Sequence, residues 1–277
     1  MFAQFIITLR EGMEAALAIA IVAAYLRKIK RNDLGKYLWL GSGLAVLASA
    51  FLSMIFWTFY GYAESYAGLW FEAISMFTAA AMLTYMVFWM AKNARKVKGE
   101  LQEKVDVAIS SGQLLGISSV AFTSVLREGA ETILFLSAAA TISFTETIIG
   151  ATLGLFAASV VVFFIMRGTV RLDWRKFFMY TSILLILFAS GITMHGAKAL
   201  QELGVLPSIV ERVYDLSSIL PEDGPLGSVL HVFFGYHDAP SLLLLLVQFG
   251  YLAIFGSYVR EVYRKTRNKR PALLPKI

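Results

Sequence analysis

Seven stretches of this chain are each long and apolar enough to cross a lipid bilayer as a helix. A helix needs about 20 mostly apolar residues to span roughly 30 Å of hydrocarbon. The composition agrees, because 58% of the residues are hydrophobic, 16% are charged and the mean hydropathy is +0.67, unlike a soluble domain. We expect an all-α integral membrane protein, a single transmembrane domain over residues 1–277. Its seven predicted helices cover residues 3–26, 37–60, 70–91, 113–140, 147–166, 177–199 and 240–259.

The basic residues indicate how these helices are threaded. Of the 25 Lys and Arg residues, 21 fall in the four segments 27–36, 92–104, 167–176 and 260–276. These segments alternate with the other connections, and Lys and Arg are in excess in cytoplasmic loops, so all four should be cytoplasmic. We expect a multi-pass protein of the cell (inner) membrane with its N-terminus outside and its C-terminus inside. The positive charge thus faces the lipid bilayer, and nucleic acid is not an expected partner.

One charged motif occurs twice inside the apolar stretches. Residues 9–17 read LREGMEAAL, and residues 126–134 read LREGAETIL. The threading makes the first helix run inward and the fourth run outward, so the two copies are antiparallel. The charged residues are Arg10, Glu11 and Glu14 in the first copy and Arg127, Glu128 and Glu131 in the second.

This antiparallel relation predicts an inverted repeat. Two three-helix units of opposite orientation and a seventh helix are typical of secondary transporters, whose ion sites lie near the bilayer midplane between the repeats. The expected divisions are repeat one over about 1–92, repeat two over about 110–200, an outer loop over 201–239, the seventh helix over 240–259 and a basic cytoplasmic tail over 260–277.

The spacing within the motif places its charges on one side of the helix. At about 100° per residue, Glu11 and Glu14 lie at ~100° and ~40° from Arg10, whereas Gly12 lies at ~200°, where it would let another helix approach. A purely structural alternative is that each Arg forms an i,i+4 ion pair within its own helix. Yet four carboxylates face two guanidiniums, and six charges cost ~15 to 20 kcal/mol of insertion free energy. We therefore interpret the motif as functional.

Converging carboxylates in a low-dielectric interior require either protons or a cation. The chain has no cysteine, and oxygen ligands favour hard cations such as Fe(III), Mn(II), Mg(II) or Ca(II). The spacing leaves open which Glu of each copy would bond a metal directly. The expected metal site consists of Glu11, Glu14, Glu128 and Glu131, with Arg10 and Arg127 as supporting residues.

Other polar residues extend these charged faces or lie near the outer side. Glu72, at the start of the third helix, is expected to support cation entrance. Candidate pathway residues are Gln4 and Thr8 toward the outside and Thr123 and Ser124 toward the cytoplasm, although such hydroxyls commonly bond their own backbone. Three histidines map to the outer side and are each interpreted as satisfied polar residues rather than metal ligands: His195, His231 and His237.

The outer loop carries a local helical pattern. Within residues 207–220 an apolar stripe predicts a short helix on the outer surface, and PEDG at 221–224 predicts a turn. The stripe consists of Ile209, Val213, Leu216 and Leu220.

Two copies of REGxE on the first and fourth of seven helices resemble the oxidase-dependent iron permeases, which include the fungal high-affinity and the bacterial EfeU-type permeases. LTYMVFWM at 83–90, GAKALQELG at 196–204 and PSLL at 240–243 are also similar to that family. The resemblance implies iron import with iron as transported substrate, no bound organic cofactor, and the four Glu residues as the translocation site. It further implies an extracytoplasmic oxidase, or in bacteria a peroxidase and a cupredoxin-like partner, that delivers ferric iron.

Two other function classes were weighed against an iron permease. An intramembrane di-iron enzyme would use Glu-x-x-His, and no Glu here has a His three residues later, so we expect a transporter rather than an enzyme. A proton-coupled transporter of another cation, such as manganese, lead or an organic cation, remains the alternative, with the Glu side chains as proton carriers.

Overall fold

The computed structural model describes residues 1–60, 66–93, 96–110, 114–166, 174–208, 210–222, 224, 226–227, 230–231 and 235–261. Within these ranges the chain is mainly helical and contains no strand. The last helix continues through a π-helical segment, Leu252–Gly256, to Glu261. The helices are α1 (Phe2–Lys28), α2 (Gly35–Tyr60), α3 (Tyr66–Asn93), α4 (Val97–Ser110), α5 (Leu114–Ile142), α6 (Phe144–Met166), α7 (Trp174–Glu202) and α9 (Leu242–Tyr251).

Five helices are long and apolar enough to cross a membrane. Only 22% of the apolar window in α2 and 17% of that in α6 is buried within the molecule, so side chains such as Leu47 and Phe156 point outward, as expected where lipid is the solvent. The five spans are Asn32–Ile55, Gly68–Asn93, Phe144–Ile165, Lys176–Glu202 and Leu242–Glu261.

Helices α1 and α5 have the length of a membrane span but not its composition. They contain 27 and 29 residues, and each carries the three charges of one REGxE copy near its middle. Length and composition therefore identify five spans, and the predicted count of seven includes these two charged helices. With several membrane-length helices, the chain is a multi-pass membrane protein.

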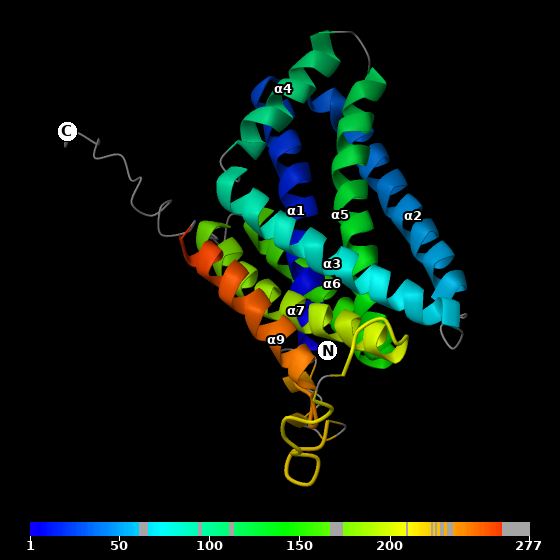
Figure 1. Ribbon diagram of the computed structural model, residues 1–277. Helices are drawn as coiled ribbons and strands as arrows, with labels where there is room; N and C mark the ends of the chain where they lie inside the picture. Colours follow the sequence, from blue (N-terminus) through cyan, green and yellow to red (C-terminus); the bar gives the residue numbers. More distant parts are fainter. Residues whose placement is uncertain are drawn as a thin grey trace, which may run out of the picture.

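Helices α1 and α5 pack against each other with opposite directions (Figure 1). The start of α1 shares a buried cluster with the end of α5 through Ile7 and Phe135. The end of α1 shares another cluster with the start of α5 through Leu26 and Ile117. Around this central pair α1 packs on α6, α5 packs on α2, and α3 packs on α7.

Small residues set the close contacts of this central pair, as expected for helix packing in membranes. A Cβ atom on Gly12 of α1 would lie 2.9 Å from the Cβ of Ala158 in α6. A Cβ atom on its counterpart Gly129 of α5 would lie 2.8 Å from the Cβ of Ser49 in α2. The prediction that Gly12 admits another helix is confirmed.

A second pair of contacts follows the same register. Gly150 of α6 lies against the carbonyl of Met1, and Gly41 of α2 lies against the carbonyl of Ser118. Met1 and Ser118 are 117 residues apart, as are the glycines of the two REGxE copies. Gly41 and Gly150 are 109 residues apart, as are the residues that these motif glycines contact. The α1–α6 and α5–α2 interfaces therefore use equivalent positions.

Helix α4 is an element that the sequence analysis did not predict, because its many charged residues indicated only a basic loop. Leu101, Val105 and Ala108 follow the helical i, i+4, i+7 pattern and are buried against Val22 and Leu26 of α1. Helix α4 thus covers the end of α1 that lies beside the start of α5 (Figure 1).

The helix predicted on the outer loop is wrong for the described residues 210–220, which form bends and turns. The N–H of Val213 donates to the carbonyl of Pro240 at 3.0 Å, and the N–H of Leu216 donates to that of Asp238 at 2.8 Å. These N–H groups donate to carbonyls of residues 238–240, just before α9, instead of to a carbonyl four residues earlier as in a helix. Ile209, part of the predicted stripe, lies outside the described residues. The predicted PEDG turn is confirmed by a 2.9 Å bond from the N–H of Gly224 to the carbonyl of Pro221.

Candidate metal centre

The two REGxE copies meet where α1 and α5 pack together in the middle of the molecule. Because the motif charges occupy one arc of each helix, antiparallel packing turns the two arcs toward each other. The side chains of Arg10, Glu11, Glu14 and Glu128 are buried. Glu131 is partly buried.

Three carboxylates converge at this contact. Glu11, Glu128 and Glu131 each offer one oxygen atom, and these oxygens all lie within 4.8 Å of one another. Among the described residues, no N–H or O–H group donates a hydrogen bond to either oxygen of Glu11 or to Oε2 of Glu128. Like charges this close in a low-dielectric interior repel strongly, so the group is stable only with a compensating proton or cation.

The two arginines bind different members of the acidic set. Arg10 Nε lies 3.0 Å from Glu14 Oε1. Arg127 Nη2 lies 2.5 Å from Glu128 Oε1, and Arg127 Nε lies 3.8 Å from Glu131 Oε1. The i,i+4 ion pairs of the structural alternative are therefore present, and they coexist with the three converging carboxylates.

Identical motifs thus have unequal surroundings. The Arg10 side chain is fully buried and its guanidinium lies 6.0 Å from the centre of the Phe178 ring. The Arg127 side chain is 55% exposed and lies 5.6 Å from the Trp89 ring. Arg10 forms a buried ion pair with Glu14, whereas the more exposed Arg127 contacts the converging group.

Three of the four candidate pathway residues donate hydrogen bonds to backbone carbonyls of their own helices. Thr8 donates to the carbonyl of Gln4 at 2.8 Å. Thr123 and Ser124 likewise donate to carbonyls one turn earlier, at 2.9 and 2.8 Å. The amide nitrogen of Gln4 lies 3.4 Å from the hydroxyl of Thr147, and its buried oxygen has no hydrogen-bond partner in the described part of the chain.

Glu72 is not a member of the converging group. It lies in α3, and its charged neighbours are Lys198 and Glu202 at the end of α7. The structure thus separates this residue, which the sequence analysis assigned to cation entrance, from the REGxE carboxylates.

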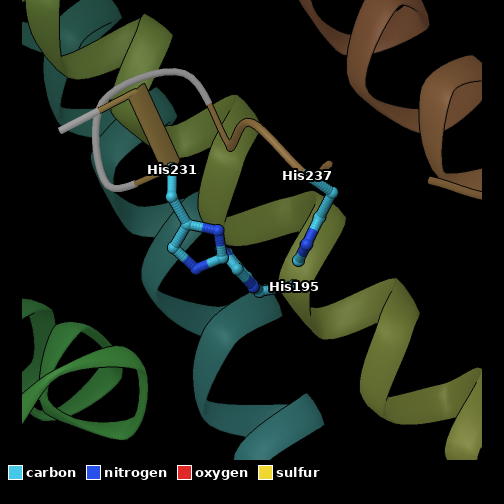
Figure 2. A group of neighbouring side chains, drawn as sticks. All are labelled: His195, His231 and His237. Carbon is cyan, nitrogen blue, oxygen red and sulfur yellow. The ribbon is translucent and has the colours of Figure 1, made fainter. Parts of the chain in front are cut away.

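The sequence analysis missed a second group. His195 of α7 comes together with His231 and His237 of the segment between α7 and α9, and each offers a nitrogen within 4.8 Å of the others. The three side chains point toward one another (Figure 2). A signal was available, because these are the only histidines of the chain and all fall in its predicted outer part.

Glu222, from the PEDG turn, joins two of these histidines. Its oxygens lie 2.9 Å from Nδ1 of His231 and 2.8 Å from Nδ1 of His237. Burial by itself would raise the pKa of Glu222, but the bonds to His231 and His237 outweigh it and hold that pKa well below its ordinary value. Burial lowers the pKa of His237 despite its bond to Glu222. The neutral imidazole is therefore favoured at His237.

The membrane-length helices surround a buried, charged centre, so the protein is of the class of multi-pass membrane proteins with ionisable groups in their interior. Such buried ionisable groups are characteristic of ion pathways. Comparison with known proteins narrows this class. The iron permease FTR1 family matches residues 1–260, and the chain belongs to that family. The resemblance inferred from the REGxE copies is confirmed.

The relatives cover nearly the whole chain. An uncharacterized protein of Archaeoglobus fulgidus is 33% identical, with 97% of this chain and 98% of the relative aligned. The ferrous iron permease EfeU of Escherichia coli O6:K15:H31 is 35% identical over 91% of this chain and 92% of its own length. The ferrous iron permease EfeU of Yersinia pestis is 36% identical over 91% and 90%. These names support a transporter rather than an enzyme. No solved structure matches the chain.

Proposed function

We propose that this protein imports iron across the cell membrane and that Glu11, Glu128 and Glu131 hold the ion in transit. The observation that carries the proposal is the approach of these three carboxylates, from two antiparallel helices, to within 4.8 Å in a member of an iron permease family. Anionic oxygen ligands suit hard cations, and a bound cation supplies the positive charge that the group lacks. The names of the EfeU relatives support iron as the cargo.

The fourth carboxylate and the two arginines have distinct roles in this proposal. Arg10 keeps Glu14 beside the site in a buried pair. Arg127 reduces the repulsion between Glu128 and Glu131 while no ion is bound. An arriving cation takes over that role, and the half-exposed Arg127 side chain can move aside more easily than the enclosed Arg10.

The proposed topology has seven membrane spans, in which the charged helices α1 and α5 join the five apolar ones. Two inverted three-helix repeats, α1–α3 and α5–α7, are followed by α9. The antiparallel α1 and α5 and the equivalent glycine contacts of the α1–α6 and α5–α2 interfaces support this arrangement. Following the positive-inside rule, the N-terminus is outside and the basic tail is cytoplasmic.

The proposed ion path runs from the outer side past Glu72 and Gln4 to the carboxylates. The oxygen of Gln4 has no hydrogen-bond partner among the residues that the structure describes, so it is available to an ion. The hydroxyls of Thr8, Thr123 and Ser124 donate to backbone carbonyls four residues earlier in their helices. They can contribute to the path only if these hydrogen bonds break.

The proposed cargo is ferric iron, produced outside the membrane by a separate oxidase or peroxidase and passed on with a cupredoxin-like partner. A trivalent ion gains the most from three or four clustered carboxylates. The competing proposal is a proton-coupled carrier of manganese, lead or an organic cation. It is favoured if a proton gradient drives uptake of such a cation while iron neither binds nor competes.

The test is uptake of radioactive iron into proteoliposomes that contain the purified protein, with ferric and ferrous iron supplied separately. Glu11→Gln and Glu131→Gln keep the side-chain size but remove an anionic ligand, and each should reduce uptake more than tenfold. Glu211→Gln, at an exposed position of the outer loop, is the matched control and should transport normally. Uptake that survives replacement of all four REGxE glutamates by Gln would refute the proposal.

A further inference from the structure

The three histidines form a compact cluster away from the REGxE carboxylates. Their ring centres lie 4.5 Å apart for His195 and His231, 5.0 Å for His195 and His237, and 4.8 Å for His231 and His237. His231 and His237 follow α7 in the sequence, and both have been brought onto it to meet His195 (Figure 2). A chance meeting of every histidine in a chain of 277 residues is a poor explanation.

Hydrogen bonds determine which nitrogen of two rings carries the proton. Nδ1 of His237 contacts a Glu222 oxygen, and Nδ1 of His231 contacts both Glu222 and the carbonyl oxygen of Tyr236, the latter at 2.8 Å. Carboxylate and carbonyl oxygens only accept hydrogen bonds, so both Nδ1 atoms must donate. In the neutral rings the lone pair is therefore on Nε2, the atom available to a metal.

Two of the remaining nitrogens have no partner among the described residues. Nε2 of His237 and Nε2 of His195 are buried, and neither has a hydrogen-bond partner in the described ranges of the chain. A buried imidazole nitrogen without a partner costs free energy unless something absent from the polypeptide binds it. The cluster is not sealed, because Glu222 and His231 side chains retain 26% and 11% exposure.

We infer that His195, His231 and His237 bind one divalent first-row transition-metal ion through imidazole nitrogen, and that Glu222 orients two of the ligands. Imidazole suits Fe(II), Zn(II), Cu(II) and Ni(II) and disfavours Mg(II) and Ca(II). A carboxylate that accepts a bond from the other ring nitrogen is the usual partner of a metal-binding histidine. Metal–nitrogen bonds of about 2.1 Å place tetrahedral ligands about 3.4 Å apart, so the nitrogens, now within 4.8 Å, draw together on binding.

This site is separate from the carboxylates in position and in chemistry. Phe178 of α7 lies against Arg10, and His195 follows 17 residues later on the same helix, or about 25 Å along its axis. Neutral nitrogen ligands select a divalent ion, in contrast to the anionic oxygen set. Metal binding at this cluster does not rest on the proposed transport.

The test is a titration of the full-length protein in detergent with Co(II), whose visible ligand-field bands report its ligands. The protein carries an affinity tag without histidine, because a polyhistidine tag would bind the probe. We expect one Co(II) ion with imidazole-type bands, retained in the triple variant Glu11→Gln, Glu128→Gln, Glu131→Gln. His195→Ala should weaken binding at least 100-fold, and Glu222→Gln about 10- to 100-fold. Thr193→Ala, on the same helix, is the control and should bind normally.

A second measurement on the unaltered protein guards against variants that misfold. X-ray absorption of the Zn(II)-loaded protein should show imidazole scattering with Zn–N distances of about 2.0–2.1 Å. Oxygen ligands only, or Co(II) binding that disappears in the triple variant and persists in His195→Ala, would overturn the inference. The histidines would then serve only to fix the loop on α7. Absence of iron uptake by the unaltered protein, with intact Co(II) binding, would count against the proposed transport and leave this site standing.

Discussion

The buried pair of Arg10 and Glu14 gives the sharpest test of how charges are balanced inside this protein. Replacing Arg10 with Met keeps most of the side-chain volume but leaves Glu14 without its partner. The two side chains are 0% and 7% exposed, so water cannot replace the lost interaction. Removing one partner of a buried ion pair costs about 3–5 kcal/mol, a large part of the roughly 5–15 kcal/mol stability of a typical protein.

The chain offers a matched control and a rescue. Arg212 and Asp215 form an exposed pair at 3.4 Å, with side chains 70% and 47% exposed, and Arg212→Met should change the unfolding free energy by less than about 1 kcal/mol. The double variant Arg10→Met, Glu14→Leu removes both charges. It should recover most of the loss, because buried ion pairs can be replaced by apolar residues with little cost.

The assay is reversible denaturant unfolding in detergent micelles, followed by tryptophan fluorescence for all four proteins. The reasoning is refuted if Arg10→Met loses no more stability than Arg212→Met. It is equally refuted if the double variant is as unstable as the single one, because Glu14 would then not be the group left uncompensated.

Three further outcomes are expected in the same assay. Gly12→Ala should lower the unfolding free energy by about 1–3 kcal/mol, because the added methyl group overpacks against Ala158. Gly43→Ala, which has open space around it, should raise the unfolding free energy by up to about 1 kcal/mol. Equal effects of the two substitutions would contradict the close α1–α6 contact. A cation at 100 times its dissociation constant should stabilise the protein by about 2.7 kcal/mol. If that cation binds at the carboxylates, Glu11→Gln should abolish the stabilisation. An unchanged stabilisation in Glu11→Gln would place the ion elsewhere. Phe135→Ala, at a fully buried position, should cost about 3–5 kcal/mol, and a cost near zero would mean that the cluster joining α1 and α5 is loosely packed.

Local sequence determined the helices well where a long apolar run met the length of a bilayer. The expected helix over 3–26 is α1, Phe2–Lys28, and that over 177–199 is α7, Trp174–Glu202. Local pattern failed where distant segments decide the structure. The stripe in 207–220 is helical in period, but residues 213 and 216 bond the returning chain near 238–240. Helix α4 was not predicted, because its many charged residues made the short apolar stripe of Leu101, Val105 and Ala108 difficult to recognise.

The sequence by itself determined that two acidic motifs lie within apolar helices, on one side of each, and that the chain belongs among iron permeases. Angular position around a helix depends only on spacing, which is why this much could be read directly. Only the tertiary structure decided that Glu11 joins Glu128 and Glu131 while Glu14 is held by Arg10. Identical motifs diverge because the neighbours of each come from other helices.

Tertiary structure alone also decided that the three histidines meet. They lie at positions 195, 231 and 237, and nothing in their spacing fixes a distance between α7 and the loop that returns to it. That distance is set by contacts between residues far apart in sequence, including the bond from Gln201 to Ser241 and those from Glu222 to the loop histidines. Spacing along a chain specifies directions around one helix, whereas packing specifies which of those directions come together.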